Sequence, residues 1–167
     1  ISGPTNLNID ENIKLIKVET AEEMFKATQA NLPTDIAIFS AAVADFKINE
    51  KKLNKIKKQD NFIINLEKNI DILNYVSNHN SMRPKLVIGF AAETNDLEKN
   101  AISKLSNKKC DWIIANDISK KDCGFNTDFN EVTIHYKEPK NKKEKLSFKK
   151  KSEISEEIVD RIVNEIN

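Results

Sequence analysis

The chain has 167 residues and an almost balanced charge, with 27 Lys and Arg against 26 Asp and Glu, and 39% of it is hydrophobic. This length is enough for one domain with a proper core and hardly enough for two. The balanced charge removes any bulk electrostatic argument for nucleic acid or a membrane surface, and the longest apolar run is far too short to span a bilayer, so we expect one cytoplasmic domain.

The first predicted elements are a short strand and a helix. The chain starts at Ile1-Ser2-Gly3-Pro4, without an initiator Met. This sequence is typical of a strand end entering a turn, so the chain is expected to be a fragment. Residues 13–18 form a β-rich run, and Thr20 with Glu23 makes a capping box for a helix over residues 21–31.

The central stretch runs from Asp35 to Phe46, where an apolar segment gives way to small residues and then to Asp45. An apolar run without polar alternation predicts a strand that is fully buried in a parallel sheet. Ligands bind at the carboxyl ends of such strands, so Ser40 to Asp45 is the first candidate site. The alternative is a buried strand that leaves through an ordinary loop. Together with the preceding elements, this stretch predicts a βαβ unit.

A basic segment follows, with six Lys between Phe46 and Asp60. Because it comes directly after the predicted strand end, we expect a mobile flap whose lysines close over an anionic ligand. The alternative is a solvated surface loop. Residues 61–66 predict another strand, and Asn69 is a suitable N-cap for a helix over residues 70–78. His79 is expected to be a solvated turn residue.

Residues 85–90 predict a further buried strand, which ends in small residues and Glu93, like the central stretch. A helix over residues 95–107 follows, and its apolar face is Leu97, Ala101, Ile102 and Leu105. Lys104 and Lys108 are four residues apart, so they share one face of that helix. They would repel mildly unless an anion lay between them. The alternative is that they simply match the negative end of the helix dipole.

The last part predicts a buried strand over 111–115, a half-exposed antiparallel strand over 131–137 and its hairpin partner over 146–149. A final helix over 154–166 should close the core with one apolar stripe, formed by Ile154, Ile158, Val159, Ile162, Val163 and Ile166. The fold class is therefore α/β, with a mostly parallel sheet and an antiparallel C-terminal hairpin.

The two cysteines and three glycines limit the possible chemistry. Cys110 and Cys123 lack metal-ligand spacing and do not make a disulfide framework, so we expect two reduced thiols, with Cys110 buried ahead of a strand. Three glycines cannot build a Gly-rich dinucleotide fingerprint or a P-loop.

Four motifs, in this order, resemble phosphopantothenate-cysteine ligase of the bacterial, CTP-dependent type, which is often fused behind phosphopantothenoylcysteine decarboxylase. They are Ala41-Ala42-Val43-Ala44-Asp45-Phe46, Lys55-Ile56-Lys57-Lys58, Gly89-Phe90-Ala91-Ala92-Glu93-Thr94 and Ala115-Asn116-Asp117. The match covers nearly the whole chain and includes Gly124-Phe125-Asn126. Each motif alone is weak, but four in order are specific. The resemblance implies a three-layer, Rossmann-like fold.

It also implies a reaction of coenzyme A biosynthesis. 4'-Phosphopantothenate attacks the α-phosphate of CTP to give an acyl cytidylate and pyrophosphate, and the amine of L-cysteine then displaces CMP to form 4'-phosphopantothenoylcysteine. Mg²⁺ accompanies the triphosphate, and FMN is expected only if a decarboxylase domain lies upstream. The family is typically dimeric, so the resemblance implies a homodimer whose seam is the antiparallel strands after Gly124.

The resemblance implies a nucleotide site formed by residues from several parts of the chain. These are Phe39, Ser40, Ala41, Asp45, Lys55, Ile70, Asp71, Ile72, Leu73, Phe90, Lys104 and Lys108. Lys55 is expected to contact the nucleotide and to matter for turnover, and Asp45 to meet the metal or the ribose. Phe90 would line the nucleotide pocket, and the two helix lysines would meet the phosphates. The family commonly has Pro where this chain has Ile70.

One family feature has no match in the chain. The family has an N-terminal βα unit with an Asn-x-Ser-Ser-Gly motif that serves the acyl-cytidylate step. We therefore expect these residues alone to bind CTP weakly and not to turn over. The competing interpretation is a non-catalytic, nucleotide-binding dimerisation module. A third, RNA binding through the lysines, lacks aromatic platforms and a net positive charge.

Overall fold

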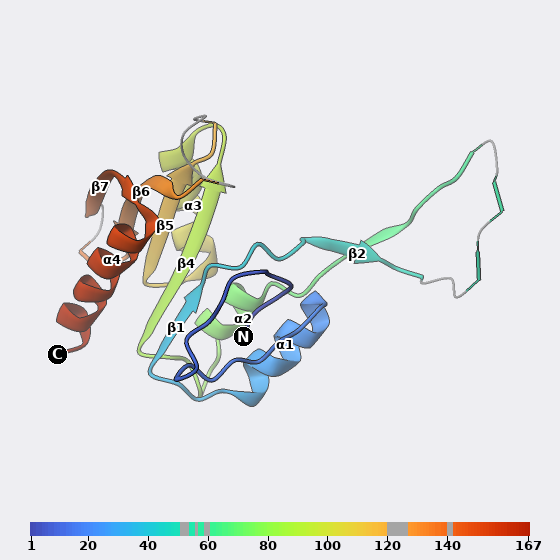
Figure 1. Cartoon of the computed structure of the whole chain (residues 1–167), viewed down its shortest axis with the longest axis horizontal. Coiled ribbons are helices and arrows are strands. Elements are labelled where there is room, and N and C mark those ends of the chain that lie inside the picture. Colours follow the sequence, from blue (N-terminus) through green and yellow to red (C-terminus); the bar gives the residue numbers. More distant parts are fainter. Residues whose placement is uncertain (51–53, 56, 59–60, 120–126, 140–141) are drawn as a thin grey trace. The chain divides into compact units, whose positions relative to one another are not determined.

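The computed structural model of the protein describes residues 1–50, 54–55, 57–58, 61–119, 127–139 and 142–167 (Figure 1). The chain divides into two units. The first contains residues 1–31 and 41–72, and the second contains residues 32–40 and 73–167. Part of the predicted flap, Cys123 and the Gly124-Phe125-Asn126 motif lie outside the described residues.

The first unit begins with a loop and helix α1 (Ala21–Ala30). The capping box is confirmed, because Thr20 Oγ1 accepts a hydrogen bond from the Glu23 N–H at 3.2 Å and the Glu23 carboxylate accepts one from the Thr20 N–H. The strand predicted over residues 13–18 is reduced to one parallel bridge between Ser2 and Lys17.

Strands β2 (Phe46–Ile48) and β3 (Leu66–Lys68) pair as an antiparallel ribbon in the first unit. The strand predicted over residues 61–66 was wrong in position, since β3 begins only at Leu66. The reason lies at the base of the ribbon, where Asn69 donates from its backbone to the carbonyl of Asp45 and from its side chain to that of Ala44, both at 2.8 Å. These bonds fix which residues of the two segments face each other.

The second unit is built on a five-stranded sheet in the order β1-β4-β5-β6-β7. Its strands are β1 (Ile36–Phe39), β4 (Leu86–Glu93), β5 (Trp112–Asp117), β6 (Phe129–Tyr136) and β7 (Lys143–Lys150). Strands β1, β4 and β5 are parallel, whereas β6 is antiparallel to both of its neighbours. The predicted mostly parallel sheet with a C-terminal hairpin is confirmed.

Helices cover both faces of this sheet, as the three-layer prediction requires. The second unit also carries α2 (Ile72–Ser77, of which Ile72 is counted with the first unit), α3 (Leu97–Lys108) and α4 (Lys151–Ile166). Residues that alternate along the strands form two clusters: Ile88 and Ile114 pack under α4, whereas Val87 and Ile113 pack under α3. Strands β4 and β5, which lie between α3 and α4, therefore have two buried faces, and this explains their continuous apolar sequence.

Several predicted faces and ends differ from the structure. Strand β1 was predicted to be fully buried, but Ile38 is 49% exposed, because β1 lies at the edge of the sheet as described. The apolar faces of α3 and α4 are narrower than predicted, so four of their predicted core residues are exposed. These are Ile102, Val159, Val163 and Ile166.

Three local predictions can be compared with the structure in the same way. Helix α2 begins at Ile72, so Asn69 joins the ribbon instead of capping the helix. His79 does lie between turn residues, where its Nδ1 accepts a hydrogen bond from the Met82 N–H at 3.1 Å, but it is half-buried against the Tyr75 ring and not fully solvated. Cys110 is a free thiol and fully buried, and this burial raises its pKa to about 12. In the described part of the chain, no helix combines the length and the apolar character needed to cross a membrane.

Candidate functional site

Three parallel strands of the second unit end at the same edge of its sheet. Phe39 at the end of β1 is in register with Gly89 on β4, and Glu93 at the end of β4 is in register with Asp117 at the end of β5. Strand β4 therefore continues four residues beyond the end of β1. This step in the carboxyl edge is the kind of position where ligands bind in open α/β sheets.

A lysine is held at this edge by a carboxylate. The Glu93 carboxylate accepts a hydrogen bond from Asn100 Nδ2 at 3.1 Å and forms an ion pair with Lys104 Nζ at 2.7 Å. Asn100 also donates to the Asn95 carbonyl at 3.0 Å, which fixes its amide. The Glu93 side chain is only 18% exposed, whereas Lys104 is 42% exposed and open to an incoming anion. The cluster of Glu93, Asn100 and Lys104 is named the edge cluster below.

Sequence reasoning selected Lys104 but gave no role to Glu93 or Asn100. The spacing of Asn100 and Lys104, four residues apart on a helix, was a usable signal, because residues at that spacing share a face and can meet one partner. Lys108 lies a further turn along the same helix, about 6 Å from Lys104 by helix geometry. Its backbone carbonyl accepts a hydrogen bond from Asn78 Nδ2.

The start of α2 packs closely on the sheet at Gly89. A Cβ atom added there would lie 2.6 Å from Leu73 Cδ2 and 2.9 Å from Ile113 Cδ1, so the bare glycine makes room for Leu73. Phe39 and Leu73 both pack against the α3-side cluster. The structure therefore brings three expected site residues, Phe39, Leu73 and Lys104, to the face of the sheet that α3 covers.

Phe90 lies on the other face. Strand residues point alternately to the two faces, and Ile88, two residues before Phe90, belongs to the α4-side cluster. Phe90 is 36% exposed and is in register with Ile114, another member of that cluster. The sheet thus separates the ring of Phe90 from the edge cluster.

Ser40 directly follows β1 and is counted with the second unit, whereas Ala41, Asp45, Ile70, Asp71 and Ile72 are counted with the first. The two hydrogen bonds of Asn69 bring Ala44 and Asp45 next to the segment that precedes Ile70 and Asp71. Asp45 is exposed. Among the residues that the structure describes, no group of three or more His, Cys, Asp or Glu side chains could hold a metal ion.

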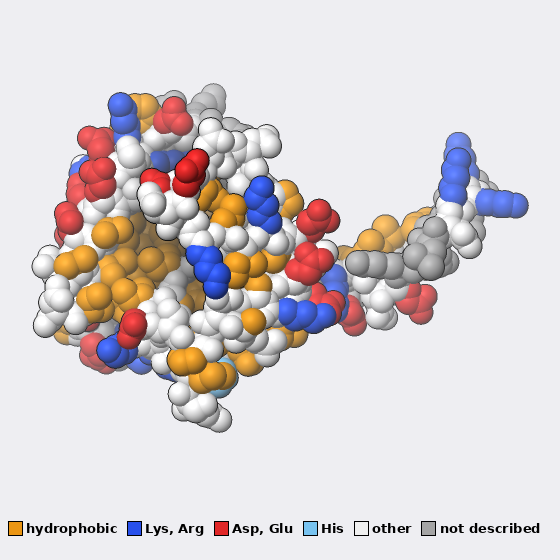
Figure 2. All heavy atoms as spheres, turned by 60° about the horizontal axis from the view of Figure 1, so that its bottom comes forward, with side chains coloured by type: hydrophobic (Ala, Val, Ile, Leu, Met, Phe, Trp, Pro, Cys, Tyr) orange, Lys and Arg blue, Asp and Glu red, His pale blue; other side chains and the backbone are white. Residues whose placement is uncertain are grey.

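The basic segment lies between β2 and β3. Lys55, Lys57 and Lys58 are exposed, and Figure 2 shows blue side chains gathered along this connection. Ile56 of the same motif lies outside the described residues. Nearer the base, Lys47 and Glu67 form an ion pair across the ribbon at 3.1 Å. The structure therefore gives Lys55 an exposed position on a long connection.

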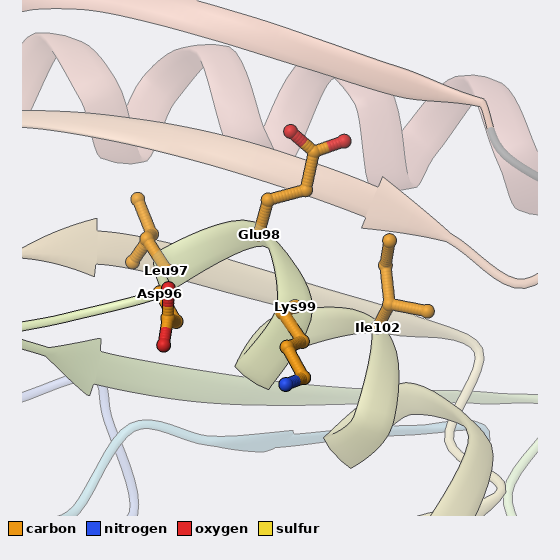
Figure 3. A pocket seen from close by; sticks show the side chains of 5 residues that line it. All are labelled: Asp96, Leu97, Glu98, Lys99 and Ile102. Atoms are coloured by element: carbon orange, nitrogen blue, oxygen red, sulfur yellow. The ribbon is translucent and has the colours of Figure 1, made fainter.

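An open hollow lies beside the first turn of α3 (Figure 3). It is lined by Asp96, Leu97, Glu98, Lys99 and Ile102. In the figure, Glu98 points toward β6 and β7, in agreement with its 2.7 Å ion pair with Lys143. This pair lowers the pKa of Glu98, mainly through the hydrogen bond from Lys143. The hollow is lined by both charged and apolar side chains, and no residue of the edge cluster is among them.

Sequence comparison finds relatives that are named for coenzyme A biosynthesis. The chain is 40% identical over 166 residues to the coenzyme A biosynthesis bifunctional protein CoaBC of Vibrio vulnificus and 36% identical over 165 residues to that of Bacillus subtilis. Each match covers 97% of this chain but only 40% of the relative, so the chain spans well under half of those proteins.

A solved structure and a family model give the same assignment. The crystal structure of the C-terminal domain of a CoaBC protein matches with a TM-score of 0.73 and 31% identity, over 96% of this chain and 69% of that one. The family model of the DNA/pantothenate metabolism flavoprotein C-terminal domain, DFP, matches residues 1–166. The chain therefore belongs to the DFP family.

Proposed function

We propose that this chain forms the CTP-binding part of a phosphopantothenate-cysteine ligase. The support is its membership of the DFP family and its likeness to proteins named for coenzyme A biosynthesis. The observation that carries the proposal is the edge cluster, where the Lys104 ammonium is held at the carboxyl edge of the sheet by Glu93 at 2.7 Å. A fixed cation at this edge suits a ligand that carries phosphates.

In the proposed reaction, a carboxylate oxygen of 4'-phosphopantothenate attacks the α-phosphorus of CTP, and the bond to the β-phosphate oxygen breaks. The amine of cysteine then attacks the acyl carbon, loses a proton and displaces CMP. Lys104 and Lys108 would face the charge that develops on pyrophosphate, and Lys55 is assigned to the nucleotide and to turnover, as the family resemblance implies. Cations aimed at developing charge lower the barrier, so the task of these residues is mainly positioning and electrostatics.

Asp45 is the residue of this chain that we assign to Mg²⁺. It offers one exposed carboxylate, and Mg²⁺ is commonly bound by one or two carboxylates together with phosphates and water. The ion, when bound, would neutralise part of the triphosphate charge. A homodimer with its seam at β6 and β7 completes the proposal. Phe129 and Phe148 are stacked there with ring centroids 5.3 Å apart, and both are exposed.

The test is calorimetric titration of Mg-CTP and Mg-ATP into this chain and its Lys104→Ala variant. We expect CTP to bind in preference to ATP, and the variant to bind CTP about tenfold more weakly, equivalent to ~1.4 kcal/mol. Lys145→Ala is the matched control, because Lys145 also pairs with a glutamate, Glu131, at 2.9 Å but lies on β7.

Binding of neither nucleotide would contradict the proposal for this chain. Preferred binding of CTP without turnover when phosphopantothenate and cysteine are added is the outcome we expect, because the chain has no Asn-x-Ser-Ser-Gly motif. The non-catalytic module differs in one measurable respect. The measurement uses a longer protein that contains both the Asn-x-Ser-Ser-Gly motif and this chain. Under the alternative of a non-catalytic module, Lys104→Ala would not change the ligase activity of that protein.

A further inference from the structure

The proposed function uses Glu93 of the edge cluster only as the partner that keeps Lys104 at the sheet edge, and it assigns that carboxylate no effect of its own on nucleotide binding. Glu93 is the last residue of β4, and its side chain is 18% exposed. A carboxylate beside a phosphate site opposes anion binding by charge repulsion, so its presence at this edge needs a physical reason.

The geometry gives that reason. Lysine has a flexible four-carbon stem, so an unrestrained ammonium occupies many positions. Here one carboxylate oxygen of Glu93 takes the Lys104 ammonium at 2.7 Å, while the other accepts from Asn100 at 3.1 Å. The ammonium has three donors, and this ion pair uses one of them. Lys104 can therefore keep its bond to Glu93 while it donates to a phosphate.

The degree of burial separates this pair from ordinary surface pairs. In the pair of Lys26 with Glu22, both side chains are at least 60% exposed, and such pairs hold their partners only weakly. In the edge cluster the carboxylate is mostly buried and is anchored by a second hydrogen bond, which keeps it in one place. Only the lysine is left open.

We propose that Glu93 is a positioning residue that holds the Lys104 ammonium ready for the phosphates of the nucleotide. This inference rests on the proposed function and deepens it. Two opposing effects follow for Glu93→Gln. Loss of the negative charge favours an anion, whereas loss of the ion pair frees the lysine, and the proposal requires the second effect to be larger.

The experiment is a double-mutant cycle on the full chain, with Glu93→Gln, Lys104→Ala and both together. Calorimetry measures the binding of Mg-CTP and of CMP, and thermal unfolding checks that each variant is folded. We expect Glu93→Gln to weaken Mg-CTP binding about fivefold and CMP binding less than about twofold, since the ion pair serves the outer phosphates. In the Lys104→Ala background only the loss of negative charge remains, so Glu93→Gln should leave Mg-CTP binding unchanged or strengthen it slightly.

The control is Glu131→Gln. It also removes one negative charge from a glutamate that is 22% exposed and paired with a lysine, and it should leave binding unchanged. The inference is overturned if Glu93→Gln strengthens or does not alter Mg-CTP binding, weakens CMP binding equally, or acts equally in the Lys104→Ala background. In each of these cases the wild-type chain still binds Mg-CTP. If the wild-type chain binds no nucleotide, the proposed function itself fails.

Discussion

The sheet of the second unit and the β2–β3 ribbon of the first hold their strands by different means. In the sheet, Val87, Ile88 and Ile113 are fully buried between layers of helices. In the ribbon, Ile48 and Leu66 remain 51% and 59% exposed, and two strands alone are marginally stable in water. The expected site lysines of the two units are therefore held in place to different degrees. Lys104 lies on a helix of a packed layer, and Lys55 lies on the connection of a ribbon.

The largest expected effect is a difference in the free energy of unfolding when the same substitution, Ile to Ala, is made in the sheet and in the ribbon. Ile113→Ala should lower the free energy of unfolding of the second unit by about 3 kcal/mol, since it opens a cavity in a closed core. Ile48→Ala should cost about 0.5 kcal/mol or less, because the side chain is already half in water. Chemical denaturation monitored by hydrogen exchange measures both, the first at the amides of β4 and β5 and the second at the amides of β2 and β3. Equal losses would contradict the difference between the regions.

The parts of the fold that sequence predicted well depend on short-range signals. The apolar runs of β4 and β5 identified buried strands because both faces of each are covered. The capping box at Thr20 gave the start of α1, since both of its partners lie within four residues. The alternation of β6 and the turn that follows it indicated the hairpin.

The parts that sequence missed depend on distant partners. Arg83 donates to both carboxylate oxygens of Asp111 at 2.9 Å, 28 residues away, and neither residue stood out as a motif. Asn69 looked like a helix cap because of its type, but its partner Ala44 lies 25 residues back. The same holds for the candidate site: the family resemblance implied a role for Lys104, whereas Glu93, which lies in one of the four motifs, gained a role only through its ion pair with α3.

A smaller loss of stability is expected at Gly89, where Leu73 at the start of α2 packs on the sheet. Gly89→Ala brings a methyl group to 2.6 Å from Leu73 Cδ2 and 2.9 Å from Ile113 Cδ1, so these side-chain ends must shift. Overpacking of this kind costs about 1 to 3 kcal/mol, and the lower end applies here because both nearest atoms are side-chain ends. Thermal unfolding gives the cost. Ala91→Gly serves as the control that removes a methyl group on the same strand face; if Gly89→Ala is neutral, the packing at this point is looser than the distances indicate.

The smallest expected effect concerns pH and is confined to the sheet. His135 on β6 is almost fully buried, and this burial lowers its pKa, while Glu98 opposes the change and Lys143 adds to it. A histidine whose pKa is lower in the folded state binds its proton more readily when unfolded. Its contribution is therefore complete above the unfolded value, near 6.5, and is lost as the pH falls through that value toward the lower folded pKa.

We therefore expect the second unit to lose stability between about pH 7 and pH 5. His135→Gln should flatten this part of the profile, because glutamine does not titrate. Glu98 itself has a lowered pKa and also destabilises the fold when it is protonated, but its contribution is lost only below its unfolded value of about 4.5. Melting temperatures measured across this range distinguish the two groups. A wild-type profile that is flat from pH 7 to pH 5 would show that the proton reaches His135 in the folded sheet as easily as in the unfolded chain, and the sheet would then be less closed at β6 than at β4 and β5.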